Sequence, residues 1–404
     1  MSGFLREQLK ASGTAQVIVV LRAATGTGAT ASVSESRRLA GHFTTAPVGR
    51  TRALAASLGT SAPECQFFPH LGVLLGTVDR EGLAALRSDP EVVSVDGAPP
   101  LSPIRPPRVA PASLDRDRTW GIERLGVPAL WDKGLTGEGI LVAHLDTGVD
   151  GEHPALRGAV AHFAEFDRMG RAIQPSAAPY DSDEHGTHTA ATLVGRPVEG
   201  RHVGVAPGAR LASAIVIEGG DAVARILAGM DWVLGLGVRV LSLSLGFRGW
   251  WTDFLAITRI LRRKGVLPVI AVGNEYAGSS RSPGNYREAL SVGAVGMDDR
   301  VPDFSSSERF DRKTDPVVPD LVAPGVGIVS AKPGGGYQEM DGTSMATPHV
   351  AGLAALLLQA KPNVKMARLE KAILDSCVRP PGMSGERGGR GVPSAVRALD
   401  ALSK

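Results

Sequence analysis

Residues 341–352 read DGTSMATPHVAG and run directly into the apolar stretch LAALLLQA at residues 353–360. The apolar half is typical of a buried helix, and the small and hydroxyl residues before it are typical of the tight turn that starts one. A serine at such a junction, Ser344, lies beside backbone N–H groups that lack a partner within the helix and favour negative charge. Ser344 could therefore be a nucleophile whose oxyanion is held there, or it could simply cap a core helix. This stretch alone does not decide between the two.

The composition of the chain excludes several classes of protein. The chain has 404 residues, 43% of them apolar and 21% charged, which is ordinary for a soluble globular protein of two or three domains. A net charge of +3 with no clustered basic stripe argues against a nucleic-acid partner. No run of about 20 apolar residues exists for a membrane span. We expect a monomer with neither nucleic acid nor membrane as partner.

The N-terminus and the cysteines bear on where the protein works. The first ten residues, MSGFLREQLK, have no apolar segment of the kind that secretory signal peptides contain. Cys65 and Cys377 are the two cysteines, and they suit a reduced compartment or a disulfide-free secreted protein. We expect a cytoplasmic protein, or one exported without a classical signal peptide.

The first 97 residues carry a pattern of their own. Strands are expected at residues 15–22, 65–68, 71–78 and 91–95, and helices near residues 50–58 and 79–87. The order β-α-β-β-α-β predicts a small α+β domain, ferredoxin-like in outline. A proline-rich stretch follows at residues 97–111, GAPPLSPIRPPRVAP, which excludes a helix or a central strand and predicts an extended linker. The predicted organisation is a first domain at 1–97, a linker at 98–118 and a second domain at 119–404.

From Trp120 onward, apolar strands alternate with helices. Strands are expected at residues 139–146, 210–216, 238–245, 266–272 and 289–295, with helices at 222–234 and 252–264. This alternation predicts an α/β fold with a mainly parallel sheet and helices on both of its faces. Asp146 and Asn274 then lie at the carboxyl ends of two strands, where functional residues gather in such sheets.

Three short stretches supply the groups that a nucleophilic serine needs. Asp146 opens DTG at a strand end, His185 opens HGTH at the start of a helix, and Asn274 follows AVG. A histidine can take the proton of a serine and return it to the leaving group, a carboxylate orients that histidine, and an amide can bind the oxyanion. Aspartic proteases also use Asp-Thr-Gly, but they need a second copy, which is missing here. The sequence GTSMA around Ser344 is not the Gly-x-Ser-x-Gly of α/β-hydrolases.

Together these motifs resemble those of the subtilisin-like (subtilase) serine peptidases, and the resemblance extends from about Trp120 to the end of the chain. It implies a serine endopeptidase that hydrolyses polypeptides through an acyl-enzyme on Ser344. In this resemblance Asp146 is the orienting acid and His185 the general base and then acid. Asn274 and the backbone N–H of Ser344 bind the oxyanion. Substrate backbone is expected to bind at two segments, Ser244, Leu245 and Gly246, and Ala271, Val272 and Gly273.

The N-terminal domain is similar in size and element order to subtilase propeptides. The resemblance implies a proenzyme that its own first domain inhibits and that cuts itself somewhere between Gly97 and Arg118. Two alternatives remain: a subtilase-shaped binding module without activity, and a regulatory protease held inhibited inside the cell. A probe that labels active serines would separate the first alternative from an enzyme.

Some residues depart from the family pattern or allow two interpretations. Ala155 follows Glu152-His153-Pro154, where many subtilases place an aspartate, and the loop at 195–201 is short and poor in oxygen ligands. We therefore expect the strong calcium site of the family to be absent and no other cofactor to be needed, and further calcium sites are left open. His144 is expected to be a hydrogen-bonded structural residue. The aromatic residues Phe247, Trp250 and Trp251 could line a substrate pocket or pack on the sheet.

Overall fold

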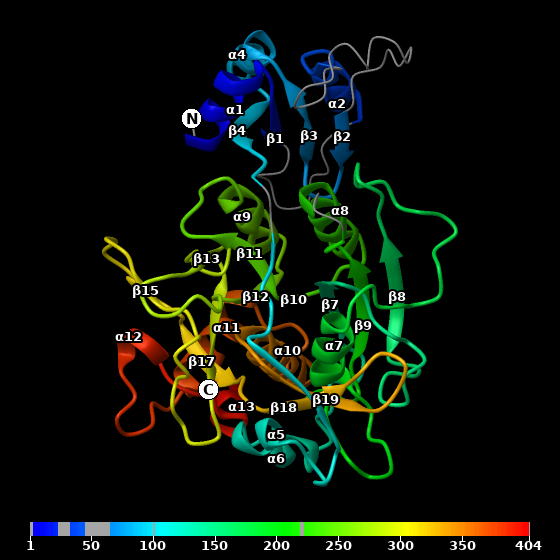
Figure 1. Ribbon diagram of the computed structural model, residues 1–404, viewed down its shortest axis with the longest axis vertical. Coiled ribbons are helices and arrows are strands. Elements are labelled where there is room, and N and C mark those ends of the chain that lie inside the picture. Colours follow the sequence, from blue (N-terminus) through cyan, green and yellow to red (C-terminus); the bar gives the residue numbers. More distant parts are fainter. Residues whose placement is uncertain (1–2, 23–32, 45–64, 100–101, 219–221, 404) are drawn as a thin grey trace.

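The structure, a computed structural model, describes residues 3–22, 33–44, 65–99, 102–218 and 222–403 (Figure 1). Two sheets organise these residues, a small one near the N-terminus and a large one in the rest of the chain. The helix expected near residues 50–58 lies outside the described residues.

The large sheet contains seven parallel strands in the order β17-β14-β12-β10-β7-β9-β8. Their bounds are β7 Leu141–Asp146, β8 Val160–Glu165, β9 Arg210–Ile215, β10 Val240–Leu243, β12 Leu267–Ala271, β14 Leu290–Val295 and β17 Leu321–Pro324. After β7 the chain adds β8 and β9 on one side, and it then crosses to β10 on the other side. The strand order therefore reverses between β7 and β10, and such a reversal opens a crevice at the carboxyl ends of the strands.

Helices cover both faces of this sheet, as Figure 1 shows. The first face carries α7 (His185–Val194), α10 (Thr343–Ala360), α11 (Met366–Ser376) and α13 (Ala395–Ser403). The second face carries α8 (Ala222–Gly235) and α9 (Leu255–Arg263). Alternate side chains of one strand serve the two cores: in β12, Val269 packs on the side of α10 and Ile270 on the side of α8 and α9. The predicted α/β fold with a mainly parallel sheet is confirmed.

The structure divides one strand that the sequence pattern joins. A single strand was expected at residues 238–245, but β10 ends at Leu243 and a separate strand, β11 (Leu245–Arg248), begins after Ser244. Both pieces are apolar and buried, so hydrophobicity does not mark the break between them. β11 belongs to a second, three-stranded sheet with the order β13-β11-β5, whose other strands are β13 (Arg281–Ser282) and β5 (Ser102–Pro103).

The small N-terminal sheet is antiparallel, with the order β2-β3-β1-β4. Its strands are β1 Ala15–Leu21, β2 Cys65–Phe68, β3 Val73–Val78 and β4 Val92–Gly97, and its helices are α1 Gly3–Ser12, α2 Val33–Ala40 and α4 Arg80–Ser88. The sequence analysis did not anticipate α1, which buries only Leu5 and Leu9, one helical turn apart, within a polar segment. Asp79 caps α4 by accepting a hydrogen bond from Gly82 N at 2.8 Å.

This small sheet packs against α8 and α9 of the large domain (Figure 1). Along β1, Val17 and Val19 face the helices of the N-terminal unit, whereas Ile18 and Val20 share a core with α8 and α9. Two hydrogen bonds join the parts: Leu71 N donates to Asp231 Oδ1 in a part-buried place and Gly97 N donates to Asp253 Oδ1 in a buried one, each at 2.8 Å. The contact is thus both apolar and specific.

The proline-rich stretch is docked rather than free. β5 pairs with β11, and β6 (Arg108–Ala112) pairs over five residues with β19 (Tyr337–Asp341), which also pairs with β18 (Ile328–Ala331). β5 and β6 are both edge strands, the positions in a sheet where proline is tolerated. The chain then enters α5 (Trp120–Arg124) and α6 (Pro128–Trp131). Two further short strands, β15 (Glu308–Arg309) and β16 (Val317–Val318), pair with each other, and a short helix, α12 (Gly385–Gly388), lies between α11 and α13 in the chain.

The shared core predicts the effect of one substitution in the N-terminal sheet. Ile18→Ala should lower the free energy of unfolding by about 2–5 kcal/mol, because it leaves a cavity between the sheet and the helices of the large domain. Urea denaturation measures this. Val93→Ala is the control: Val93 on β4 is 49% exposed, so its loss should change stability by no more than about 0.5 kcal/mol. Equal stability of the two variants would contradict burial of Ile18.

Candidate active site

Four elements bring the predicted polar residues to the crevice. Asp146 is the last residue of β7, and Asn274 follows β12 by three residues. His185 is the first residue of α7, and Ser344 is the second residue of α10. Because the strands are parallel, their carboxyl ends share one edge of the sheet, and both helices begin at that edge.

Asp146 and His185 form a buried, hydrogen-bonded pair. His185 Nδ1 lies 2.7 Å from Asp146 Oδ1, which also accepts a hydrogen bond from Thr147 N at 2.8 Å. Burial alone would lower the pKa of His185, but the charge of Asp146 and its hydrogen bond outweigh burial, so the pKa is raised. Burial likewise opposes ionisation of Asp146, but the charge of His185 and the hydrogen bond keep its pKa below the usual range.

The start of α10 has features that expose Ser344 to the crevice. Gly342 caps the helix at φ 155°, and a Cβ there would lie 3.3 Å from Asn274 Nδ2. Pro348 has no N–H and so leaves the carbonyl of Ser344 without its usual helical partner; Ser244 Oγ donates to that carbonyl at 3.4 Å. The side chain of Ser344 is fully buried by the segment that covers it, as described below.

The amide of Asn274 is oriented from behind. Thr343 N and Thr343 Oγ1 both donate to Asn274 Oδ1, at 3.0 and 2.9 Å. These bonds fix which end of the amide is oxygen, so Nδ2 is presented as a donor. No local signal in the sequence marks this role of Thr343.

A segment of the linker occupies the crevice. In antiparallel register, Pro103 pairs with Leu245 and Ser102 with Gly246, and Ile104 N donates to Ser244 O at 3.4 Å. The side chain of Ile104 is fully buried, whereas Arg105 is exposed. Ser344 Oγ donates to the carbonyl of Ile104 at 3.1 Å, and Asn274 Nδ2 donates to the carbonyl of Arg105 at 2.9 Å. A hydroxyl and an amide donor therefore bind consecutive peptide carbonyls, and the buried His185 borders a cavity that the same linker residues line, an arrangement suited to acyl transfer.

The second predicted backbone segment lies at the end of β12. Arg281 N donates to Val272 O and Ser306 N donates to Gly273 O, at 2.9 and 3.0 Å, so Ala271, Val272 and Gly273 are held by the large domain itself. Arg281, which the sequence analysis missed, is only 3% exposed and forms an ion pair with Glu275. Its Nη1 also donates to Gly246 O at 2.9 Å, so it braces the strand that pairs with the linker.

Other residues around the site also became visible only in three dimensions. Asp181 accepts hydrogen bonds from Thr147 Oγ1 at 2.7 Å and from the N and Oγ1 of Thr187 at 2.6 Å, so it holds residues that flank Asp146 and His185. Of the aromatic residues left open by the sequence, Phe247 is in the core shared with α8 and α9, and Trp251 contacts Phe247 and Phe4. Trp250 is 44% exposed and contacts Tyr286 and Phe310.

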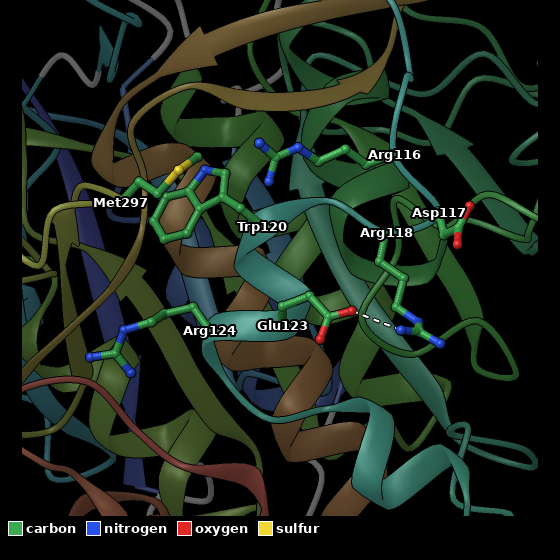
Figure 2. Close-up of a pocket in the computed structure, with 7 residues that line it drawn as sticks. All are labelled: Arg116, Asp117, Arg118, Trp120, Glu123, Arg124 and Met297. Carbon is green, nitrogen blue, oxygen red and sulfur yellow. Dashed lines mark hydrogen bonds and ion pairs between the residues drawn. The ribbon is translucent and has the colours of Figure 1, made fainter.

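One cavity borders the site, and a larger one lies elsewhere in the large domain. One of about 140 Å³ is bordered by His185, Thr147, Met340 and the linker residues from Pro103 to Pro106. A separate cavity of about 560 Å³ is lined by Arg116, Asp117, Arg118, Trp120, Glu123, Arg124 and Met297 (Figure 2). In this second cavity Arg118 pairs with Glu123, and Arg124 pairs with Asp299. Its lining is largely committed to internal ion pairs and contains no nucleophile.

The described residues contain neither a group of metal ligands nor a membrane-spanning helix. Within them, no three His, Cys, Asp or Glu side chains are grouped so that they could hold a metal ion. None of the helices in the described part of the chain combines the length and hydrophobicity that spanning a bilayer requires.

Comparisons with known proteins agree with this geometry. The sequence pattern of the Subtilase family matches residues 137–393. The chain is 33% identical over 298 residues to M-protease of Shouchella clausii (strain KSM-K16), an alignment that covers 73% of this chain and 71% of that protein. It is 37% identical over 246 residues to Subtilisin Savinase of Lederbergia lenta, covering 60% and 85%. It is 32% identical over 306 residues to Subtilisin E of Bacillus subtilis (strain 168), covering 73% of each.

The buried pair predicts how His185 titrates. In Ser344→Ala protein, NMR of labelled histidines should place the pKa of His185 above about 6.5, because Asp146 favours the imidazolium. Asp146→Asn should lower it, because burial then acts with less opposition. His349, whose pKa burial lowers to about 4, is the internal control and should not move. A pKa of His185 below 6.5 in the parent would contradict this account.

Proposed function

Because this chain belongs to the subtilase family and is a subtilisin-like serine endopeptidase, we propose that it acts through an acyl-enzyme on Ser344 and is made as a self-inhibited proenzyme. One observation carries the proposal. A stretch of the protein's own backbone, residues 102–104, is paired with β11 and the preceding Ser244 as an extended peptide would be, and its end lies beside Ser344, His185 and Asn274.

The residues divide the chemistry among them. His185 Nε2 is buried and has no hydrogen-bond partner among the described residues, so it can accept the proton of Ser344 once that hydroxyl turns away from Ile104 O. Ser344 Oγ then attacks the carbonyl carbon, and the oxyanion is bound by Asn274 Nδ2 and Ser344 N. His185 gives the proton to the leaving amine as the C–N bond breaks.

Hydrolysis of the acyl-enzyme needs a water molecule on the same face. The cavity of about 140 Å³ beside His185 is large enough for several waters, each of which takes up about 30 Å³ in the liquid. His185 would take a proton from one of them as that water attacks the ester carbonyl, and it would return the proton to Ser344 Oγ as the ester C–O bond breaks. Asp146 stays ionised throughout and stabilises the imidazolium that forms in each step.

The register of the linker identifies the bond in question. Ile104 inserts its side chain and donates its N–H to Ser244 O, so the Ile104–Arg105 peptide bond lies next to Ser344. The donor of Asn274 is occupied by the next carbonyl, that of Arg105, and not by Ile104 O. We take this arrangement as the inhibited state. The segment fills the site, but Asn274 Nδ2 binds the carbonyl of Arg105 instead of that of Ile104. A small shift that brings Ile104 O to Asn274 would make the bond reactive.

The N-terminal domain anchors this segment in the site. Its sheet shares an apolar core with α8 and α9, and the chain passes from Gly97, bonded to Asp253, to β5 within five residues. On this basis residues 1–97 are the inhibitor domain, 98–118 the linker and 119–404 the peptidase domain, all acting within one molecule.

We also propose that the strong calcium site of the family is missing. The loop at 195–201 closes on itself, because Val198 and Arg201 exchange two backbone hydrogen bonds of 2.9 Å. The N–H of Ala155, which follows Pro154, donates to His153 Nδ1 at 3.1 Å. These contacts leave few oxygen atoms there for a hard cation.

The proposal predicts a specific self-cleavage. Purified wild-type chain should convert to fragments 1–104 and 105–404, as measured by intact mass, whereas Ser344→Ala chain should stay whole. Ile104→Lys should slow the conversion by about tenfold or more, because a charge would then have to be buried in place of an apolar side chain.

Val109→Lys is the matched control for that substitution. Val109 lies in the same linker but is 45% exposed, so conversion should continue at the wild-type rate. Cleavage that persists in Ser344→Ala protein, or that maps to another bond, would overturn the assignment of Ile104–Arg105.

The processed enzyme predicts a second result, at Asn274. Asn274→Ala should lower kcat on a peptide substrate by about 100- to 1000-fold with little change in KM, because the donor acts mainly on the oxyanion. Steady-state kinetics measures both constants. Thr347→Val is the control, since Thr347 is buried on the same helix as Ser344 and its hydroxyl donates to Thr343 O, not to a linker carbonyl. A fall in kcat/KM that came entirely from KM would contradict an oxyanion role.

A further inference from the structure

A buried chain of hydrogen bonds leads from β9 to the catalytic carboxylate. We propose that Ser213, His144 and Thr189 form a relay that positions Asp146 for His185. These three are positioning residues, since they touch neither the substrate nor the nucleophile. The inference rests on the proposed roles of Asp146 and His185, but it concerns residues to which the reaction itself assigns no part.

The relay is continuous from one residue to the next. His144 and Ser213 are partners across the parallel pairing of β7 with β9, and His144 Nδ1 lies 3.0 Å from Ser213 Oγ. On the other side of the ring, His144 Nε2 lies 2.9 Å from Thr189 Oγ1, which is 3.4 Å from Asp146 Oδ2. All four side chains are buried, so water does not compete for these bonds. The relay serves Oδ2, whereas His185 and Thr147 use Oδ1.

The charge of Asp146 selects the direction of the relay. His144 Nε2 is 3.8 Å from Asp146 Oδ2, so a lone pair on Nε2 would face a carboxylate, whereas an N–H there is attracted to it. With the proton on Nε2, His144 donates to Thr189 Oγ1 and accepts from Ser213 at Nδ1. The hydroxyl hydrogen of Thr189 is then free of His144 and can point to Asp146 Oδ2.

Two backbone carbonyls compete for that hydrogen. His185 O and Gly186 O each lie 3.1 Å from Thr189 Oγ1, in the helical positions to which a threonine commonly donates. The carboxylate is farther away but ionised, and hydrogen bonds to ionised groups are about twice as strong as neutral ones. The contact from His144 also polarises the hydroxyl and strengthens what it donates.

The relay works because His144 stays neutral. Burial lowers the pKa of His144 to about 4, so above that pH the ring offers Asp146 a donor through Thr189 without a competing positive charge. The charged groups that face it are Asp146 on its own strand and His185 on α7. The neighbouring strands contribute Ser213 and Ser242, which carry no charge. The one titratable group of α10, His349, is bonded to Met345 O.

The test compares two buried threonines of α7. Thr189→Val removes the donor to Asp146, so the carboxylate charge is less dispersed and favours the imidazolium of His185 more strongly. The pKa of His185 should therefore rise, and the acid limb of kcat/KM, which reports that pKa, should move up by about half a pH unit. We also expect kcat to fall by about 3- to 10-fold, the rate equivalent of one hydrogen bond, with KM nearly unchanged. Thr192→Val is the matched control: Thr192 is equally buried on the same helix, but its hydroxyl donates to His188 O. Thr189→Ser keeps a hydroxyl and should restore the wild-type profile.

The outcomes separate this inference from the proposed function. All variants are first titrated with a fluorophosphonate, which counts reactive Ser344. If wild-type protein is not labelled, the proposed function fails. If it is labelled and active, but Thr189→Val matches Thr192→Val in acid limb and kcat, the relay alone is wrong. If Thr189→Val protein folds poorly, Ser213→Ala serves as the second test. A smaller upward shift of the acid limb of kcat/KM supports the relay, and an unchanged pH profile of kcat/KM overturns it.

Discussion

The close packing of α7 against α10 is the constraint on which the site depends. His185 and Ser344 lie at the starts of these two helices, so the distance between the proposed base and the proposed nucleophile is set by how the helices meet. Gly352 lies at that contact: a Cβ there would be 2.7 Å from a side-chain atom of Val205 and 3.4 Å from Leu193 O. Both helices are buried almost throughout against one face of the sheet, so they have little freedom to slide.

Burial and charge compete at each histidine in this region, and the balance leaves a single base. Burial dominates at His144, His188 and His349 and lowers their pKa values to about 4, about 3 and about 4. At His185 the adjacent charge of Asp146 outweighs burial, so the pKa is raised instead of lowered. All four rings are similarly inaccessible to solvent, so the difference comes from one carboxylate at hydrogen-bond distance. Of these four buried imidazoles, the fold thus makes that of His185 more basic and keeps the other three neutral.

The sequence predicted those parts of the site that are marked by local pattern. Asp146, His185, Asn274 and Ser344 each lie where a strand or helix begins or ends, and glycines, hydroxyl residues or apolar runs beside them indicate such points. The family and the α/β fold followed from these motifs and are confirmed. The orienting bonds of Thr343 and Asp181, and the break between β10 and β11, depend on residues distant in sequence and have no local signal. Proline content indicated that the linker is extended, but only strand pairing could place Ile104 beside Ser344.

The ladder between β6 and β19 has a consequence for what happens after a cut in the linker. Five residue pairs, together with an ion pair between Arg108 and Glu339, anchor the chain just beyond Arg105. An amino group newly formed at Arg105 would stay three residues from this anchor, at an effective concentration that for such short tethers is on the order of millimolar. It could attack the ester on Ser344 and remake the peptide bond in competition with water. Detachment of one of the strands, rather than the bond cleavage itself, would then make activation irreversible.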